Sequence, residues 1–246
     1  MFNTELNKLL CKIDGDTFII SDTHFNHDGI LKWQPGRLAS MRDDGFALNL
    51  NDDETEALNL EHTEWIIKRW NAVVQSDDIV IHTGDLAFKG HREIVPRLNG
   101  IKILILGNHD KKGPNTYNQF DHVVRGAYKI ENNKVYIAEC QDALFSSIQV
   151  IIDKQTCLLS HYPATIQEYR YNKVDGVKVP RTILNNRIDE LLKICNHEKI
   201  DFNIHGHTHS NSYNYDLTEA RNWNFVNISM EVIDFKPIRI KDLLCW

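Results

Sequence analysis

The sequence predicts an α/β protein in which short buried strands alternate with amphipathic helices. Five apolar runs rich in Ile, Val and Leu each lead into an Asp, Gly or His residue, which is typical of strands that end at a sheet edge. The runs are continuous rather than alternating, so we expect strands buried on both faces and paired in parallel. These predicted strands are Thr17–Ser21, Asp78–His82, Ile101–Leu106, Thr156–Ser160 and Ile200–His205.

Three further apolar runs in the middle of the chain predict additional strands. They cover Val123–Ile130, Val135–Glu139 and Ile148–Ile152. The first two are joined through the turn-forming sequence 131–133, which contains two asparagines. We expect this region to form a second sheet.

Helical periodicity appears in two segments between the predicted strands. The first runs from about Asp53 to Val74 and places Ile66 and Trp70 on one face. The second follows Pro180 and repeats apolar side chains at Leu184, Ile188, Leu191, Leu192 and Cys195.

Two long segments fit neither pattern. Gln34–Asn51 is polar and turn-rich, with little periodicity, and Pro163–Pro180 carries several aromatic and basic residues around a glycine. Connections of this length are usually binding loops, lids or disordered segments. We therefore leave both segments unassigned.

Length and composition place the chain among ordinary globular proteins. Its 246 residues are 42% apolar, which is enough for a full core, and we expect one domain over residues 1–246. The formal net charge of −6 argues against a surface that tracks long nucleic acids, because that affinity comes largely from Lys and Arg side chains.

Other signals favour a cytoplasmic protein. The first residues contain no apolar segment typical of a secretory signal, and no stretch approaches ~20 uncharged apolar residues, so we expect no membrane span. The five cysteines are scattered and form no C-x-x-C pair. This favours reduced thiols over disulfides or a thiolate zinc site.

Five short polar clusters follow the predicted strands and contain the residue types that bind metal ions. In α/β sheets, ligands bind beyond the carboxyl ends of the strands, so distant clusters at those ends would converge on one place. The clusters are Asp22-Thr23-His24, Gly84-Asp85, Gly107-Asn108-His109-Asp110, Ser160-His161 and Gly206-His207-Thr208-His209.

Together these clusters offer the ligands that two adjacent divalent cations need. Carboxylate, amide and imidazole groups without sulfur suit Mn, Fe, Zn or similar ions, and a carboxylate such as Asp85 can bridge two of them. Two cations roughly 3.5–4 Å apart can clamp an in-line phosphoryl displacement and activate a water. His109 lies next to Asn108 and is a candidate to protonate the leaving oxygen.

Three of the clusters have a simpler interpretation when taken alone, whereas Gly206-His207-Thr208-His209 is more specific. A D-x-H pattern occurs by chance, Gly84-Asp85 is a common turn, and the cluster at 107–110 could be a loop because Asn and Asp favour turns. A single structural metal would use fewer ligands than the chain offers. The order of the clusters, their place after strands and their complementary ligand types favour one dinuclear site instead.

These residues resemble the calcineurin-like metallophosphoesterase superfamily, whose pattern runs D-x-H, G-D, G-N-H-D/E, H and G-H-x-H. The matching motifs span residues 22 to 209. The extension 25–27, the string 160–163 and the late segment 227–244 also resemble a small prokaryotic and phage branch of predicted phosphoesterases. The resemblance implies a four-layer α/β/β/α sandwich of two mixed sheets flanked by helices.

The resemblance also implies roles for the residues that match. It implies that Asp85 bridges two ions and that His109 is the catalytic histidine, with Asp110 supporting the site. The remaining ligands would be Asp22, His24 and His209 for the first metal, and Asn108, His161 and His207 for the second.

Substrate contacts are less clearly marked. His27 could support the metal site or approach the substrate, and Arg37 is a candidate phosphate contact, as are Lys89 and Arg170. Each of these basic residues could equally be a solvated surface charge. Three aromatic residues, Trp33, Tyr169 and Tyr171, could stack on a base, and the other histidines are expected to be structural or surface residues: His62, His82, His91, His122, His197 and His205.

We therefore predict a metal-dependent phosphoric ester hydrolase with two divalent cations. Manganese is the first expectation, and iron, zinc or nickel are alternatives. The predicted substrate is a phosphodiester of a nucleotide or another small organic phosphate. The alternatives are a phosphomonoesterase or nuclease with the same site, and a non-catalytic scaffold that keeps the fold.

Overall fold

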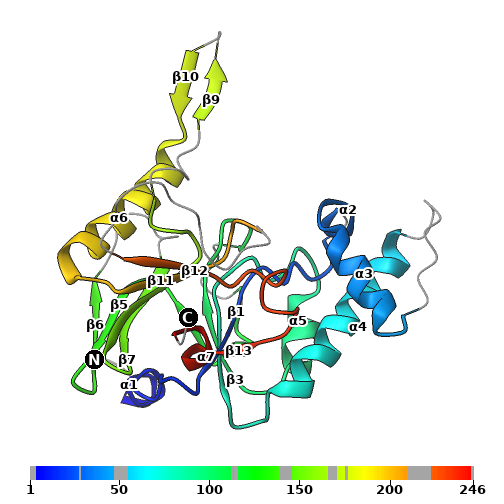
Figure 1. Ribbon diagram of the computed structural model, residues 1–246, viewed down its shortest axis with the longest axis horizontal. Helices are drawn as coiled ribbons and strands as arrows, with labels where there is room; N and C mark the ends of the chain where they lie inside the picture. Colours follow the sequence, from blue (N-terminus) through cyan, green and yellow to red (C-terminus); the bar gives the residue numbers. More distant parts are fainter. Residues whose placement is uncertain are drawn as a thin grey trace.

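The computed structural model describes residues 4–27, 29–46, 55–111, 113, 116–138, 146–165, 171–174, 177–209 and 223–244. It has two mixed sheets with helices on their outer sides, as predicted (Figure 1). No helix within these ranges is both long enough and apolar enough to span a bilayer.

The first sheet has five strands, and its centre is parallel. β1, β2, β3 and β4 run in the same direction, and β13 adds an antiparallel edge. In spatial order the strands are β13 (Ile238–Arg239), β1 (Phe18–Ile20), β2 (Ile79–His82), β3 (Ile101–Ile105) and β4 (His122–Val124).

The second sheet has six strands of mixed direction. β8, β11 and β12 are parallel to one another, whereas β7 pairs antiparallel with β8, and β5 pairs antiparallel with β6. In spatial order the strands are β12 (Asn224–Asn227), β11 (Phe202–His205), β8 (Gln155–Ser160), β7 (Ser146–Ile152), β5 (Gly126–Glu131) and β6 (Lys134–Ala138).

One hydrophobic core joins the two sheets. It includes Ile103 of β3 and Ile148 of β7, and both side chains are fully buried. The predicted helix near 53–74 is α4 (Thr55–Val73), whose Trp65 and Trp70 also belong to this core. The predicted second helix is α6 (Thr182–Glu198), which covers the other sheet through a smaller cluster around Leu191. The order of layers is therefore helix, sheet, sheet, helix.

Shorter helices connect or flank these layers. α1 (Thr4–Leu10) begins the described chain and α7 (Ile240–Leu244) ends it. α5 (His91–Ile94) and the 3₁₀ turn η2 (Val95–Arg97) connect β2 to β3.

The structure corrects one sequence-based prediction and shows regular structure in the two segments that the sequence left unassigned. The run Val123–Ile130 is not one strand: β4 ends at Val124 in the first sheet, and β5 begins in the second sheet at Gly126, whose φ is 126°. The segment Gln34–Asn51 contains a helix, α3 (Pro35–Asp43), preceded by α2 (Ile30–Trp33). Two of the residues that α3 buries are Arg37 and Met41, and a buried arginine hides the apolar periodicity.

The segment Pro163–Pro180 also contains regular structure. β9 (Tyr171–Val174) and β10 (Val177–Pro180) form an antiparallel arm that projects from the body of the molecule (Figure 1). The rest of this segment within 166–170 and 175–176 lies outside the described residues.

Candidate metal centre

The predicted ligands follow the carboxyl ends of strands in both sheets. Asp22 follows β1, Asp85 follows β2, and Asn108 follows β3, which are parallel neighbours. His161 and His207 follow β8 and β11, which are parallel neighbours in the other sheet. The two sheets thus bring all five segments to one edge, as the sequence predicts.

The backbone at this edge adopts conformations that are unfavourable for side chains with a Cβ. Positive φ angles occur at Asp22 (57°), His24 (49°), Asp85 (55°), His207 (69°) and His209 (47°). Such strain persists where the surrounding structure holds it, and it concentrates at functional sites. Here it turns each side chain back toward its neighbours.

Asp22, His24 and His209 form one group of converging ligand atoms. The Nε2 atoms of His24 and His209 are 3.1 Å apart, and Asp22 Oδ1 lies 3.5 Å from His209 Nε2 and 3.9 Å from His24 Nε2. Ligand atoms of all three lie within 4.8 Å of one another. This is the spacing expected around one cation.

A second group lies beside the first. Asp22, Asp85 and His161 also offer ligand atoms within 4.8 Å of one another. Asn108 Oδ1 is 2.8 Å from His161 Nε2. Asp85 Oδ2 lies 3.6 Å from His161 Nε2 and 3.7 Å from His24 Nε2, so this carboxylate stands between the two groups.

His207 lies on the side of the second group. Its ring centroid is 5.1 Å from that of His161, and its backbone N–H donates to Asp22 Oδ2 at 2.9 Å. Two glycines allow the loops to approach this closely, because they have no Cβ. A Cβ on Gly107 would overlap Asp85 Oδ1, and a Cβ on Gly206 would overlap Asp22 Oδ2.

Burial and neighbouring charges shift the pKa values of the candidate ligands. Burial, reinforced by Asp22 and Asp110, raises the pKa of Asp85 well above its usual value, while burial and His209 lower the pKa of His24. Among the described residues, Asp22 Oδ1 and His24 Nδ1 are buried without a hydrogen bond. Buried carboxylates need a partner, and these oxygen and nitrogen donors fit divalent cations.

Neighbouring groups fix how the imidazoles are aimed. His161 Nδ1 lies 3.0 Å from the carbonyl oxygen of Thr83, and His209 Nδ1 lies 3.3 Å from Glu231 Oε2. In both rings the Nε2 atom is therefore left to face the centre. This arrangement is typical of metal-ligating histidines.

Comparison with known proteins agrees with the site. A sequence profile described as the calcineurin-like phosphoesterase superfamily domain matches residues 58–228, which is more than half of the chain. The chain belongs to this superfamily. The converging ligands therefore form the candidate metal centre of this calcineurin-like phosphoesterase superfamily domain.

Two curated proteins match part of the chain. An uncharacterized protein of Methanocaldococcus jannaschii is 38% identical over 101 residues, which cover 39% of this chain and 47% of that protein. Gene 66 protein of Mycobacterium phage L5 is 34% identical over 119 residues, which cover 46% of this chain and 47% of that protein. The chain thus spans about half the length of the curated relatives it matches.

A solved structure covers more of the chain. A protein of unknown function from Aquifex aeolicus aligns with a TM-score of 0.56 at 22% identity, over 93% of this chain and 97% of that one. This likeness shows a shared calcineurin-like fold.

The structure corrects the interpretation of Arg37 as a phosphate contact. Its side chain is fully buried and donates to the carbonyl oxygens of Asp22 at 2.7 Å and Thr23 at 2.9 Å. Its Nε also donates to Glu231 at 2.8 Å. Arg37 therefore holds the strained backbone of the first motif, and none of its surface is accessible to substrate.

Glu231 is a functional residue that sequence reasoning missed. It belongs to no recognised motif, but its buried carboxylate joins Arg37 to His209. Burial alone would raise the pKa of Glu231, but the charges of Arg37 and His209 outweigh it and lower the pKa to about 2. The sequence signal that could have found it is its place within the late segment 227–244, which resembles the small phosphoesterase branch.

Asp110 is a positioning residue rather than a catalytic one. Its Oδ2 accepts from the backbone N–H groups of Asp85 at 2.9 Å and Gly107 at 2.7 Å, and its Oδ1 accepts from Leu86 and Tyr117. These hydrogen bonds join two motif loops, which agrees with the supporting position that the resemblance implies for Asp110.

His109 stands at the open rim of the centre. Its backbone N–H donates to Asp85 Oδ1 at 2.9 Å, while its imidazole is 48% exposed with Nε2 3.9 Å from Asp85 Oδ2. Burial and the nearby His161 lower the pKa of His109, and an anionic phosphate beside the ring would favour its protonated form.

The other candidates separate into three groups. His27 is buried against aromatic rings near the centre, and Lys89 is exposed. Arg170, Tyr169 and the side chain of Tyr171 lie outside the described residues. Among the histidines expected to be structural, burial lowers the pKa of His82 and His205 to about 4 and keeps both neutral.

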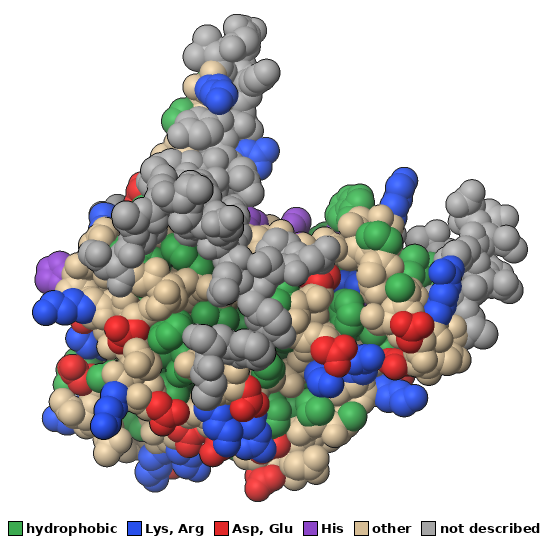
Figure 2. Space-filling model, viewed as in Figure 1, with side chains coloured by type: hydrophobic (Ala, Val, Ile, Leu, Met, Phe, Trp, Pro, Cys, Tyr) green, Lys and Arg blue, Asp and Glu red, His purple; other side chains and the backbone are tan. Residues whose placement is uncertain are grey.

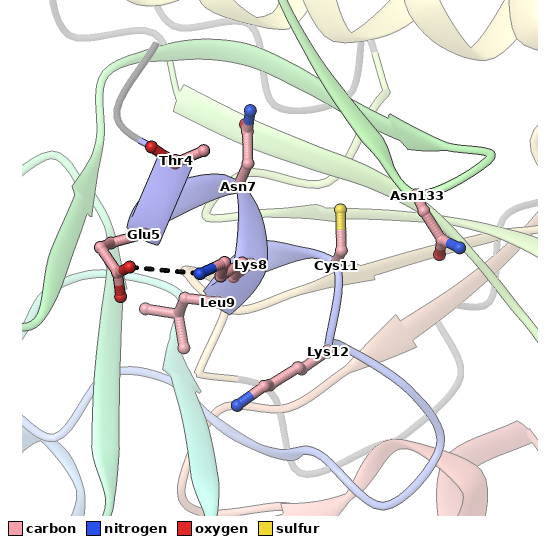
Figure 3. Close-up of a pocket in the computed structure, with 8 residues that line it drawn as sticks. All are labelled: Thr4, Glu5, Asn7, Lys8, Leu9, Cys11, Lys12 and Asn133. Atoms are coloured by element: carbon pink, nitrogen blue, oxygen red, sulfur yellow. Dashed lines mark hydrogen bonds and ion pairs between the residues drawn. The ribbon is translucent and has the colours of Figure 1, made fainter.

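A separate surface hollow lies at α1, away from the strand ends that carry the centre (Figure 3). Its single carboxylate, Glu5, pairs with Lys8 at 3.4 Å. The lining is Thr4, Glu5, Asn7, Lys8, Leu9, Cys11, Lys12 and Asn133, so it does not gather metal ligands.

Proposed function

We propose that this chain is a phosphodiesterase that uses two divalent cations to hydrolyse a nucleotide or another small organic phosphodiester. The observation that supports this most strongly is the position of Asp85, whose Oδ2 lies within 3.7 Å of a histidine nitrogen in each of the two ligand groups. One carboxylate placed in this way is suited to bridge two ions.

Seven side chains would bind the two cations, and His109 would act as the general acid. Asp22, His24 and His209 would hold one cation, and Asn108, His161 and His207 would hold the other, with Asp85 shared. When bound, the ions supply a hydroxide near neutral pH and neutralise charge on the phosphoryl oxygens. His109, on the open rim, donates its proton to the oxygen of the leaving alcohol as the P–O bond breaks.

A substrate comparison tests the proposal. The protein would be loaded in turn with Mn, Ni, Zn and Mg, and turnover of bis(p-nitrophenyl) phosphate would be compared with that of p-nitrophenyl phosphate. We expect two ions per chain by elemental analysis, highest turnover with manganese, and preference for the diester. Preference for the monoester would make the chain a phosphatase. Two bound ions without turnover of either ester would favour a non-catalytic scaffold.

A further inference from the structure

A strip of aromatic rings leads away from the metal centre. The ring centroids of His109 and Phe88 are 5.1 Å apart, and Phe88 also stacks on His24 at 5.8 Å with an interplanar angle of 28°. His27 packs between Phe88 and Trp33, with centroids 3.9 Å and 5.0 Å away. The strip therefore begins beside the proposed general acid and ends at Trp33 in α2.

The outer rings of this strip are exposed. Trp33 is 66% exposed, the highest value among the large exposed hydrophobic side chains in the described ranges, and Phe88 is 36% exposed. The core tryptophans Trp65 and Trp70 are almost completely buried. Figure 2 shows hydrophobic side chains over the region of α2 and histidines at the surface between it and the β9–β10 arm. Exposed aromatic area beside a polar site indicates a binding surface.

The strip is also held in place. Gly29 lies under the Trp33 ring so closely that a Cβ there would be 3.2 Å from it, and the Gly29 N–H donates to His27 Nδ1 at 3.0 Å. α3 follows α2 directly, and its Arg37 is bonded to the backbone of the first metal motif. A ring positioned in advance loses little entropy when it binds a ligand.

We propose that Trp33 and Phe88 form a stacking subsite for a nucleobase of the substrate, while the phosphate occupies the metal centre. The inference rests on the proposed phosphodiesterase function and narrows its substrates to nucleotides. Stacking accepts every base, because each base has an aromatic face, and purines overlap the rings more than pyrimidines do. The subsite therefore selects for a base without reading its identity.

Binding of two phosphates that share a ribose tests the subsite. Adenosine 5′-monophosphate and ribose 5-phosphate would be titrated calorimetrically into the manganese-loaded protein, with released phosphate measured afterwards to confirm that both stay intact. We expect the nucleotide to bind about 5- to 100-fold more tightly. Trp33→Ala should abolish most of this ratio, and Trp33→Phe should retain part of it. Tyr136→Ala, which removes a 50% exposed ring from β6, should leave the ratio unchanged.

The outcomes separate the two proposals. Equal affinity for both ligands in the wild-type protein, or a ratio that survives Trp33→Ala, would overturn the nucleobase subsite while diester turnover stayed intact. Failure of the metal-loaded protein to bind either phosphate or to turn over bis(p-nitrophenyl) phosphate would overturn the phosphodiesterase function, and the subsite with it.

Discussion

Replacement of Glu231 by glutamine tests the buried ion pair that supports the metal centre. The variant keeps the shape of the side chain but removes its charge, and it leaves the guanidinium of Arg37 buried beside a neutral amide. Arg37 Nη2 lies 2.6 Å from Glu231 Oε1, and the two side chains are 0% and 3% exposed. Glu231→Gln should therefore destabilise the fold and loosen His209, whose Nδ1 faces the same carboxylate.

The pKa of Glu231 sets the size of the effect. A pKa that falls from 4.5 to about 2 on folding corresponds to a stabilisation of roughly 3 kcal/mol, because a pKa change of one corresponds to about 1.4 kcal/mol. Removing one partner from a buried ion pair typically costs about 3–5 kcal/mol, which agrees. At about 2–4 °C per kcal/mol for a chain of this size, Tm should fall by roughly 6–12 °C.

The matched control is Glu64→Gln. Glu64 pairs with Arg97, but these side chains are 50% and 47% exposed, so its loss should cost less than about 1 kcal/mol. Both variants would be unfolded in urea with a chelator present, so that metal binding does not contribute. If Glu231→Gln lowers the free energy of unfolding by no more than Glu64→Gln does, the buried pair does not stabilise the fold.

The pH dependence gives an independent check. Because the folded pKa of Glu231 is lowered, its stabilisation is fully present above pH 4.5 and is lost as the pH falls toward about 2. The difference in unfolding free energy between wild type and Glu231→Gln should therefore shrink as the pH falls below 4.5. A difference that grew on acidification would contradict this.

Three further predictions concern the centre itself. His109→Ala should keep both metals but lose turnover by ~10²–10⁴-fold, with the larger loss on an alkyl ester whose leaving group needs a proton; equal turnover by variant and wild type on alkyl and aryl esters would remove the acid role. Asp85→Asn should weaken both metal sites together, and elemental analysis that still finds two ions per chain would disprove the bridge. Asp110→Asn should lower the free energy of unfolding by roughly 2–3 kcal/mol, because the amide would place an N–H group against backbone N–H donors that bond the carboxylate in the wild type. Urea unfolding identical to that of the wild type would show that the two loops do not need this carboxylate.

Local patterns in the sequence predicted much of this fold. The continuous apolar runs at β1, β2, β3, β8 and β11 mark strands buried on both sides, and such strands need little help from distant residues to be recognised. The motif residues follow those strands, so their convergence could be expected from the rule that parallel strands share a carboxyl edge.

The features of the fold that the sequence did not predict have a common physical origin. α3 was not predicted because its buried face includes Arg37, whose buried charge is paired with Glu231 from far along the chain. The break between Val124 and Gly126 was hidden within one run, since a change of sheet leaves no mark on hydropathy. Both features depend on partners that are close in space and distant in sequence.

The amino-acid order by itself determined which strands are buried and which donor atoms end them, because hydrophobic burial and ligand chemistry are properties of the residues themselves. Tertiary packing decided the rest: that Arg37 supports the centre rather than the substrate, that Glu231 aims His209, and that Asp110 ties two loops together. Those roles depend on contacts of a few ångströms between separate elements, because the charge of a side chain affects the groups that lie near it in space rather than in sequence.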